Sequence, residues 1–270
     1  MYSVKRLHES LACRHLSVVF ASLFVLAFGC PVRAQLPDAP KPLVQDADAI
    51  TLRNTPLHIL QDQGAIWTSP IHIRPHDLKW LLPLGAATGV AIATDQRALR
   101  DFISLNKNFN NDNTNISNVL IGGFIAAPIG LYAAGHVTDD GHLRETGILT
   151  GESLIDGVVV EQGMKLIFWR ERPTVDSQRG RFFQSSAGVD SSFPSSHAVL
   201  AWAAASSIAS EYPNTWTRIV VYTGATGISL ARLMGQQHYP SDVLVGSAAG
   251  WLIGRYVVHH RHRWHNPISR

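Results

Sequence analysis

The sequence has little cysteine and little charge. Of its 270 residues only two are cysteines, Cys13 and Cys30, and only 16% are Asp, Glu, Lys or Arg. Both cysteines lie in a segment that we expect to be removed on export, so the mature chain would have no disulfide, thiolate nucleophile or cysteine metal site. The net charge of +3 is small, and the basic residues form no long stripe. A nucleic-acid-binding role therefore has little support.

Residues 1–34 have the pattern of a signal peptide. A basic start precedes thirteen apolar or small residues at positions 16–28, and residues 32–34 (Val-Arg-Ala) suit a signal peptidase. We expect cleavage after Ala34, which would place the protein in the periplasm or cell envelope. An uncleaved anchor helix is the alternative, although a membrane span needs about 20 residues. Lipidation at Cys30 is a minor alternative.

The rest of the chain divides into an irregular start and a series of apolar segments. Residues 35–79 are rich in proline and histidine and are expected to form an extended lead-in with room for a short helix. Six apolar segments of helical length follow, at 80–94, 117–134, 144–169, 197–210, 216–233 and 241–258. They predict an all-α fold, an antiparallel six-helix bundle over residues 80–258. The polar stretch 95–116 between the first two is predicted to be a surface loop.

The last apolar segment and the tail have their own patterns. Gly246, Gly250 and Gly254 leave one face of the last helix bare, so another helix can approach closely. Residues 259–270 are interpreted as a flexible basic, His-rich tail rather than a metal site. Most of the apolar segments are shorter than the roughly 20 residues that a membrane-spanning helix needs. If all six segments crossed the membrane, the C-terminal arginines would lie on its outer side, against the positive-inside tendency. A soluble or surface-bound periplasmic bundle is therefore favoured over an integral membrane protein.

Three polar clusters are the most specific pattern in the chain. They are Lys165–Pro173 (KLIFWRERP), Pro194–His197 (PSSH) and Ala231–Asp242 (ARLMGQQHYPSD). In an antiparallel bundle the first ends the third helix and the second begins the fourth. The last cluster connects the fifth helix to the sixth. All three are thus predicted to meet at one end of the bundle.

Together the clusters contain the groups needed to bind a phosphate and break its ester bond. A phosphoryl group in transfer spreads negative charge over its oxygens, which fixed cations and oriented N–H groups stabilise. Three cations are available, namely Lys165, Arg172 and Arg232. Ser195 can donate its hydroxyl. Of the two histidines, one can attack phosphorus while the other protonates the leaving oxygen. Asp242 follows His238 by four residues and can hold its ring.

The order Lys-x6-Arg-Pro, Pro-Ser-x-His, Arg-x5-His-x3-Asp resembles that of the type 2 phosphatidic acid phosphatase (PAP2) superfamily. That superfamily includes bacterial class A acid phosphatases and vanadium haloperoxidases. By this resemblance His238 would be the nucleophile that forms a phosphohistidine, Asp242 its partner and His197 the general acid. The phosphate would bind to Lys165, Arg172, Ser195, Arg232 and the main-chain N–H of Ser196. The resemblance also implies an all-helical catalytic fold and a reaction that needs no metal or other cofactor.

Two positions depart from the family's usual pattern. Ser196 replaces the usual glycine, so its side chain is expected to crowd the oxyanion, and Ala231 replaces the usual serine, so the placement of Arg232 is expected to be looser. Both changes are expected to modulate activity without removing a catalytic group.

The resemblance implies a metal-independent phosphatase of the cell envelope. Its expected substrate is a lipid phosphate or diphosphate, such as phosphatidate or a polyprenyl carrier, and a soluble phosphomonoester is the close alternative. A vanadate-dependent haloperoxidase and a non-catalytic phospholipid-binding protein are the other classes. Each cluster alone has an ordinary explanation, as a charged helix end, a capped helix start or a satisfied His–Asp pair. The occurrence of all three clusters in this order favours a phosphate-binding catalytic site.

Overall fold

The structure, a computed structural model, describes residues 50–174 and 179–265. Within these residues all regular elements are helices, so the predicted all-α class is confirmed. The α-helices are α2 (Thr55–Thr68), α3 (Leu78–Asp101), α4 (Lys107–Val137), α5 (Gly141–Phe168), α6 (Ser196–Glu211), α7 (Thr215–Met234) and α8 (Pro240–His265). The predicted signal peptide, and the cleavage and lipidation positions within it, lie outside the described residues.

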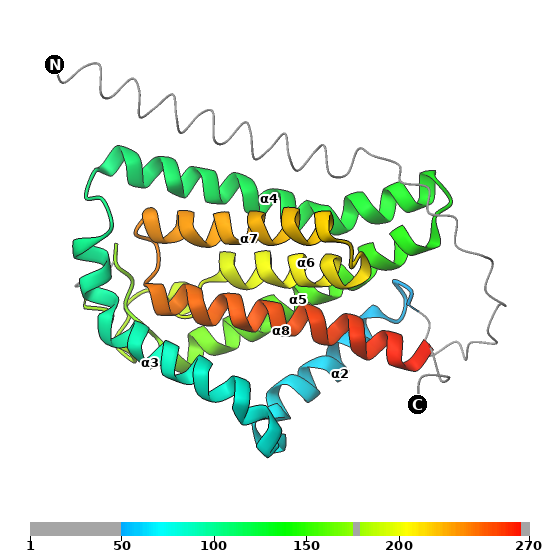
Figure 1. Cartoon of the computed structure of the whole chain (residues 1–270), viewed down its shortest axis with the longest axis horizontal. Coiled ribbons are helices and arrows are strands. Elements are labelled where there is room, and N and C mark those ends of the chain that lie inside the picture. The colour runs from blue at the N-terminus through cyan, green and yellow to red at the C-terminus, as the bar shows by residue number, and fades with distance from the viewer. Residues whose placement is uncertain (1–49, 175–178, 266–270) are drawn as a thin grey trace.

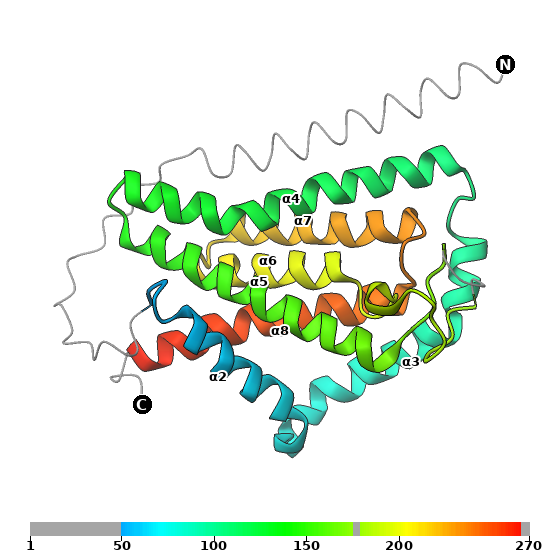
Figure 2. The ribbon, with the colours of Figure 1, turned by 180° about the vertical axis from the view of Figure 1, so that it is seen from behind.

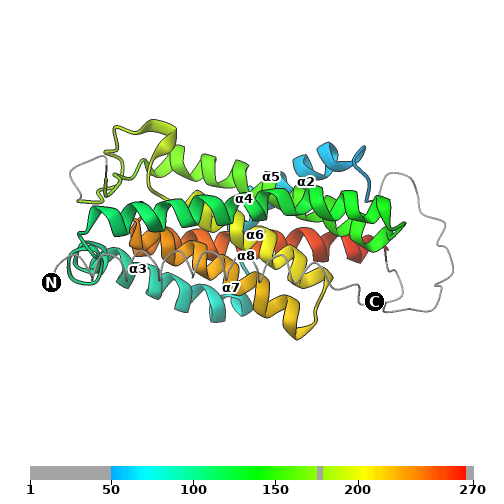
Figure 3. The ribbon, with the colours of Figure 1, turned by 90° about the horizontal axis from the view of Figure 1, so that it is seen from above.

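Helices α4 to α8 lie side by side as a bundle, and α2 and α3 form a V along one edge of it (Figures 1 and 2). Short 3-10 helices η2 (Ser69–His72) and η3 (Pro75–Asp77) make the corner of the V. Seen from above, α4 runs between α5 on one side and α7 on the other (Figure 3). Each of the six predicted segments overlaps one of the helices α3 to α8. Helix α2 was not predicted as a seventh, so the described residues contain seven α-helices rather than six.

Helix α6 is the centre of the bundle because its residues are small. Its alanines, among them Ala201, Ala204 and Ala205, are fully buried in a core shared with α4, α5 and α7. On the other side of α6, the predicted close approach along the glycine face of α8 is confirmed. A Cβ at Gly250 would overlap the backbone of Val199, and one at Gly254 the backbone of Ala203.

The predicted loop over residues 95–116 is wrong for most of its length. Helix α3 continues to Asp101, and α4 begins at Lys107. Asparagine and threonine have low helix propensity, but here their side chains form hydrogen bonds with the backbone of the helix. The Asn106 carbonyl oxygen Oδ1 accepts hydrogen bonds from the backbone N–H groups of residues 108 and 109, which caps α4.

The regions that flank the predicted bundle are also more regular than expected. The lead-in contains the 14-residue helix α2. The predicted flexible tail is helical as far as His265, because α8 runs on without a break. Within that stretch Arg261 is buried, and its Nη2 lies 2.7 Å from the Asp62 carboxylate of α2. An ion pair to α2 thus holds the end of α8.

In the described part of the chain, α4 is the one helix that is long and apolar enough to cross a membrane. Of its most apolar window, 28% is buried inside the protein. Several large apolar side chains of α3 are also exposed, including Trp80, Leu82 and Val90.

Candidate active site

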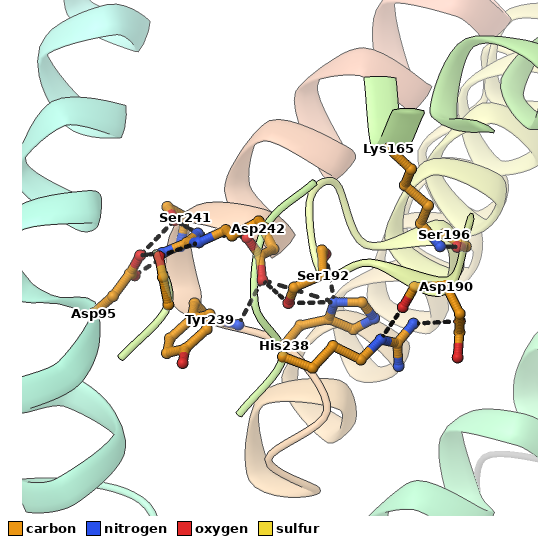
Figure 4. A network of polar contacts seen from close by, with 12 residues as sticks. Asp95, Lys165, Asp190, Ser192, Ser196, His238, Tyr239, Ser241 and Asp242 are labelled. Carbon is orange, nitrogen blue, oxygen red and sulfur yellow. Dashed lines mark hydrogen bonds and ion pairs between the residues drawn. The ribbon is translucent and has the colours of Figure 1, made fainter. Parts of the chain in front are cut away.

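The structure brings the three polar clusters together where α5 and α7 end and α6 and α8 begin. Figure 4 shows part of the network of polar contacts among them. Lys165, near the end of α5, donates from Nζ to Ser196 Oγ at the start of α6, at 2.8 Å. The backbone N–H of Ser195 donates to the carbonyl of Asp242 on α8, at 3.1 Å. Eight predicted site residues from four helix ends therefore lie in one small region.

The connection between α5 and α6 makes this possible. Helix α5 ends at Phe168, and Trp169 adopts a left-handed conformation, with φ of 38°, that turns the chain back toward the bundle. The backbone N–H of Ser192 then donates to the carbonyl of Arg170 at 2.9 Å. The first and second polar clusters are thereby held against each other.

His238 is buried and held in one orientation. Its Nδ1 lies 2.8 Å from the backbone carbonyl of Ser192. A carbonyl can only accept a hydrogen bond, so Nδ1 carries the proton and the lone pair of the neutral ring is on Nε2. Burial lowers the pKa of His238 well below 6.5, and the charges of Arg172, Arg232 and Lys165 lower it further. The ring is thus neutral in the free protein.

Asp242 lies farther from His238 than the spacing predicts. Its Oδ2 is 3.7 Å from His238 Nδ1, too far for a good hydrogen bond. Ser192 instead connects the two, since its carbonyl accepts from His238 and its hydroxyl donates to Asp242 Oδ2 at 2.6 Å. The expectation that Asp242 holds the ring directly is therefore replaced by contact through Ser192.

Arg170, which the sequence pattern did not single out, is the main partner of Asp242. Its Nη1 lies 2.5 Å from Asp242 Oδ1, and its Nη2 lies 2.6 Å from Asp95 Oδ2 on α3. The guanidinium also lies between the rings of Phe182 and Tyr239, 4.6 Å and 4.4 Å from their centroids. Burial raises the pKa of Asp242, and Arg170 opposes that shift.

Asp95 extends this network to helix α3. Its carboxylate accepts from the backbone N–H and the hydroxyl of Ser241, at 3.1 and 2.5 Å. The first turn of α8, which carries Asp242, is thus fixed from α3 as well as from the α5–α6 connection. No signal in the sequence pointed to Asp95, because it lies in the stretch predicted to be a loop.

The three predicted phosphate-binding cations are all buried. Lys165 contacts Ser196 Oγ and lies 3.4 Å from Glu161 Oε2, and its pKa is lowered chiefly by burial. Arg172 Nη2 lies 2.7 Å from Asp190 Oδ1. Arg232 Nη1 donates to Asn118 Oδ1 at 3.2 Å, and burial lowers its pKa to about 10.

Three buried donors in this region have no hydrogen-bond partner among the described residues, the hydroxyls of Ser195 and Tyr239 and the Nε of Arg232. Two of them, on Ser195 and Arg232, belong to residues predicted to bind phosphate. Buried polar groups are nearly always paired in folded proteins, so an unpaired donor indicates a missing ligand or water. Since both groups are donors beside several cations, the arrangement suits an anion.

The Ser196 side chain does not stand free in the site. Its hydroxyl accepts from Lys165 Nζ and donates to Glu161 Oε2 at 3.1 Å. The side chain therefore points toward Lys165 and Glu161. The crowding expected from replacing glycine is in this way accommodated by a three-residue hydrogen-bonded chain.

His197 reaches the site from the first turn of α6. Its Nε2 lies 3.0 Å from Asn118 Oδ1, the same oxygen that accepts from Arg232. Burial lowers the pKa of His197 to about 3, with further lowering by the charges of Arg232, His238, Arg172 and Lys165. Asn118 lies inside the predicted apolar segment of α4, where no motif marked it.

Within the described residues, no group of three or more His, Cys, Asp or Glu side chains is arranged to hold a metal ion.

The part of the chain that contains the site is similar to known proteins. Residues 147–266 match the model of the PAP2 superfamily, and this range contains all eight predicted site residues. A 65-residue segment is 37% identical to a lipid A 1-phosphatase of Porphyromonas gingivalis. That segment covers 23% of this chain and only 15% of the relative. No solved structure matches the chain.

Proposed function

We propose that the chain is a phosphatase of the PAP2 superfamily acting through a phosphohistidine intermediate, which the match of residues 147–266 to that superfamily supports. The observation that carries this proposal is the pair of unpartnered buried donors, Ser195 Oγ and Arg232 Nε, beside a neutral buried histidine. Donors without acceptors suit a bound phosphate, and a neutral imidazole is the form that can attack it.

In the first step the lone pair on Nε2 of His238 attacks phosphorus, and the bond from phosphorus to the ester oxygen breaks. The Ser192 carbonyl keeps the proton on Nδ1 and stabilises the positive charge that develops on the ring. His197 donates a proton to the leaving oxygen. Water then attacks the phosphohistidine, giving up its proton to His197, and the bond between Nε2 and phosphorus breaks to release phosphate.

Lys165, Arg172 and Arg232 stabilise the phosphoryl oxygens through both steps, with the hydroxyl of Ser195 and the N–H of Ser196. Burial, and after it the charges of the same cations, hold the pKa of His197 low in the free site. A bound phosphate offsets their charge, so we expect the pKa of His197 to rise when substrate binds. This ties protonation of the general acid to the presence of substrate.

The proposed substrate is a lipid phosphate or diphosphate. The relative with the matching segment is a lipid A 1-phosphatase, which supports a lipid phosphate as the substrate class. Asn118 at the site is followed on α4 by the exposed Val119, with Ile129 exposed farther along. We propose that the catalytic domain spans residues 80–258, that residues 1–34 direct export, and that the mature protein lies against the envelope membrane.

Phosphate release by the full chain, with chelator present, tests the proposal. The substrates are phosphatidate, a polyprenyl diphosphate, lipid A and p-nitrophenyl phosphate, each with and without vanadate, an anion that resembles phosphate. We expect vanadate-sensitive release, with a lipid preferred over p-nitrophenyl phosphate. Release that needs an added divalent ion would contradict the mechanism, and a preference for the small ester would instead indicate a soluble-ester phosphatase.

A further inference from the structure

One acidic side chain lies against the phosphate-binding cations from the solvent side. Asp190 ends the 3-10 helix η4 (Gly188–Asp190), and its Oδ1 lies 2.7 Å from Arg172 Nη2. The Asp190 side chain is 73% exposed, whereas that of Arg172 is 9% exposed. The carboxylate therefore reaches from solvent to a guanidinium that is otherwise enclosed.

This carboxylate affects more than one of the cations. Its charge acts on Lys165 and on Arg232 as well as on Arg172. Glu161 also contacts Lys165, but it is buried on α5, inside the bundle. Asp190 thus places a negative oxygen on the open side of the site, where a phosphate oxygen would approach Arg172.

We propose that Asp190 competes with phosphate for Arg172 and so sets how tightly the site binds phosphate. The inference rests on the proposed function, because it takes Arg172 as a phosphate ligand. When phosphate arrives, the Asp190 carboxylate leaves Nη2 and remains in solvent. When inorganic phosphate leaves as product, the carboxylate returns.

A second contact lets this exchange occur without loss of order. Arg172 Nε donates to the backbone carbonyl of Asp190 at 2.5 Å. On the Asp190 side that bond uses only the backbone carbonyl, so it persists when the Asp190 side chain moves. Arg172 stays oriented while one of its nitrogens changes partner, and the exchange weakens product binding without disordering the site.

The opposite role for Asp190 would be to hold Arg172 in place for binding. The two roles predict opposite signs when the charge is removed. Asp190→Asn keeps the size of the side chain and the backbone contact, and removes the competing negative charge. If Asp190 competes, phosphate binds more tightly to the variant; if it positions Arg172, phosphate binds more weakly.

The experiment is titration calorimetry of inorganic phosphate, and separately vanadate, into the full chain with chelator present. The matched control is Asp139→Asn at the opposite end of the bundle, where an exposed Asp139 pairs with Arg144 at 3.2 Å. We expect Asp190→Asn to lower the Kd for phosphate about fivefold, the scale of an exposed ion pair. The control should leave Kd unchanged.

Each other result overturns a specific claim. An equal or higher Kd in Asp190→Asn overturns competition by Asp190 and leaves the proposed phosphatase untouched. An equal fall in Kd in the Asp139→Asn control overturns competition as well, because the effect would then be one of net charge. Failure of all three proteins to bind either anion overturns both proposals. Tighter binding in Asp190→Asn without any hydrolysis supports competition and contradicts the phosphatase.

Discussion

Two buried polar networks lie toward opposite ends of the bundle, and they differ in their balance of carboxylates and cations. The first, which we call the catalytic network, includes Arg170, His238, Asp242 and the three cations proposed to bind phosphate, Lys165, Arg172 and Arg232. The second, the α2 cluster, consists of Thr55, His58, Asp62, Gln63, Glu152, Asp156 and Arg261. Both are built from charged side chains on buried helix faces.

In the α2 cluster, carboxylates outnumber fixed cations. Asp62, Glu152 and Asp156 each have one oxygen without a hydrogen-bond partner among the described residues. Burial raises the pKa of Asp62 to about 6 and that of Asp156 to about 7. In the catalytic network the unpartnered atoms are donors instead. In the α2 cluster the Nε of Arg261 faces a carboxylate oxygen, Glu152 Oε2, at 3.7 Å. The unpartnered carboxylate oxygens of that cluster suit protons, whereas the unpartnered donors of the other network, beside several cations, suit an anion.

The largest expected effect comes from removing the proposed nucleophile. His238→Ala should lower phosphate release by about 10⁴-fold or more, because it removes the group proposed to form the covalent intermediate. An acid-labile phosphoenzyme should form in the parent and not in this variant. Asp62→Asn, in the other network, serves as the control and should retain activity. Full activity of His238→Ala would refute the mechanism.

The two buried arginines give a paired test of the comparison. Arg170→Met and Arg261→Met should each lower the free energy of unfolding by about 3–5 kcal/mol, because each leaves buried carboxylates without their cation. Only Arg170→Met should also abolish activity in the fraction that remains folded, since it disturbs Asp242. Urea unfolding and phosphate release measure the two effects. Equal loss of activity in both variants would mean that the networks are not functionally distinct.

The α2 cluster should contribute a pH dependence of stability opposite in sign to that of the buried histidines His197 and His238, whose pKa values are lowered in the folded protein. Asp62 and Asp156 have raised pKa values when folded, so the folded protein binds protons more tightly than the unfolded chain. This stabilisation is complete below the ordinary pKa of 3.8 and is lost as pH rises through 6 to 7. We expect the contribution of these two carboxylates, the free energy of unfolding of the parent minus that of the Asp62→Asn, Asp156→Asn double variant, to fall by about 2–4 kcal/mol between pH 4 and pH 8, measured by urea unfolding. A difference that does not change with pH would contradict the assignment.

Asn118 offers a smaller effect within the catalytic network. Its amide oxygen accepts from Arg232 and contacts His197, so Asn118→Ala should lower kcat about tenfold through loss of orientation. Asn118→Asp should instead move the limb of the pH–rate profile that reports His197 to higher pH, because a nearby carboxylate raises the pKa of His197. Two variants with the same pH profile as the parent would show that Asn118 has no positioning role.

The smallest effect is expected at Ser196. Ser196→Gly restores the residue usual in the family but removes the hydroxyl between Lys165 and Glu161. These changes oppose each other, so kcat/KM should change by no more than about threefold. A tenfold gain would show that the hydroxyl crowds the phosphate despite its hydrogen bonds.

The sequence predicted those parts of the site that local spacing determines. Arg232, His238 and Asp242 fall at one helix end and the next helix start, so their convergence follows from helix direction alone. Asp95, Asn118 and Asp190 could not be found this way. Each reaches the site from a separate element, and its contact depends on how the helices pack.

The errors in the predicted fold have a similar cause. Low helix propensity suggested a loop at 95–116, yet the Asn106 cap and tertiary packing make most of it helical. The tail at 259–265 and the lead-in helix α2 each looked irregular alone. They become ordered together, because the Asp62–Arg261 ion pair joins them across 199 positions of sequence.

The backbone contact between α6 and α8 has a consequence for how this protein can evolve. His197 is carried by α6, and His238 and Asp242 stand at the entrance to α8, so the glycine face of α8 sets the spacing of the catalytic groups. That spacing is determined by main-chain atoms, which substitution of outer side chains leaves unchanged. The periphery of the bundle is therefore free to diversify, while Gly246, Gly250 and Gly254 are the positions at which a larger side chain would push α6 and α8 apart and displace the proposed catalytic groups.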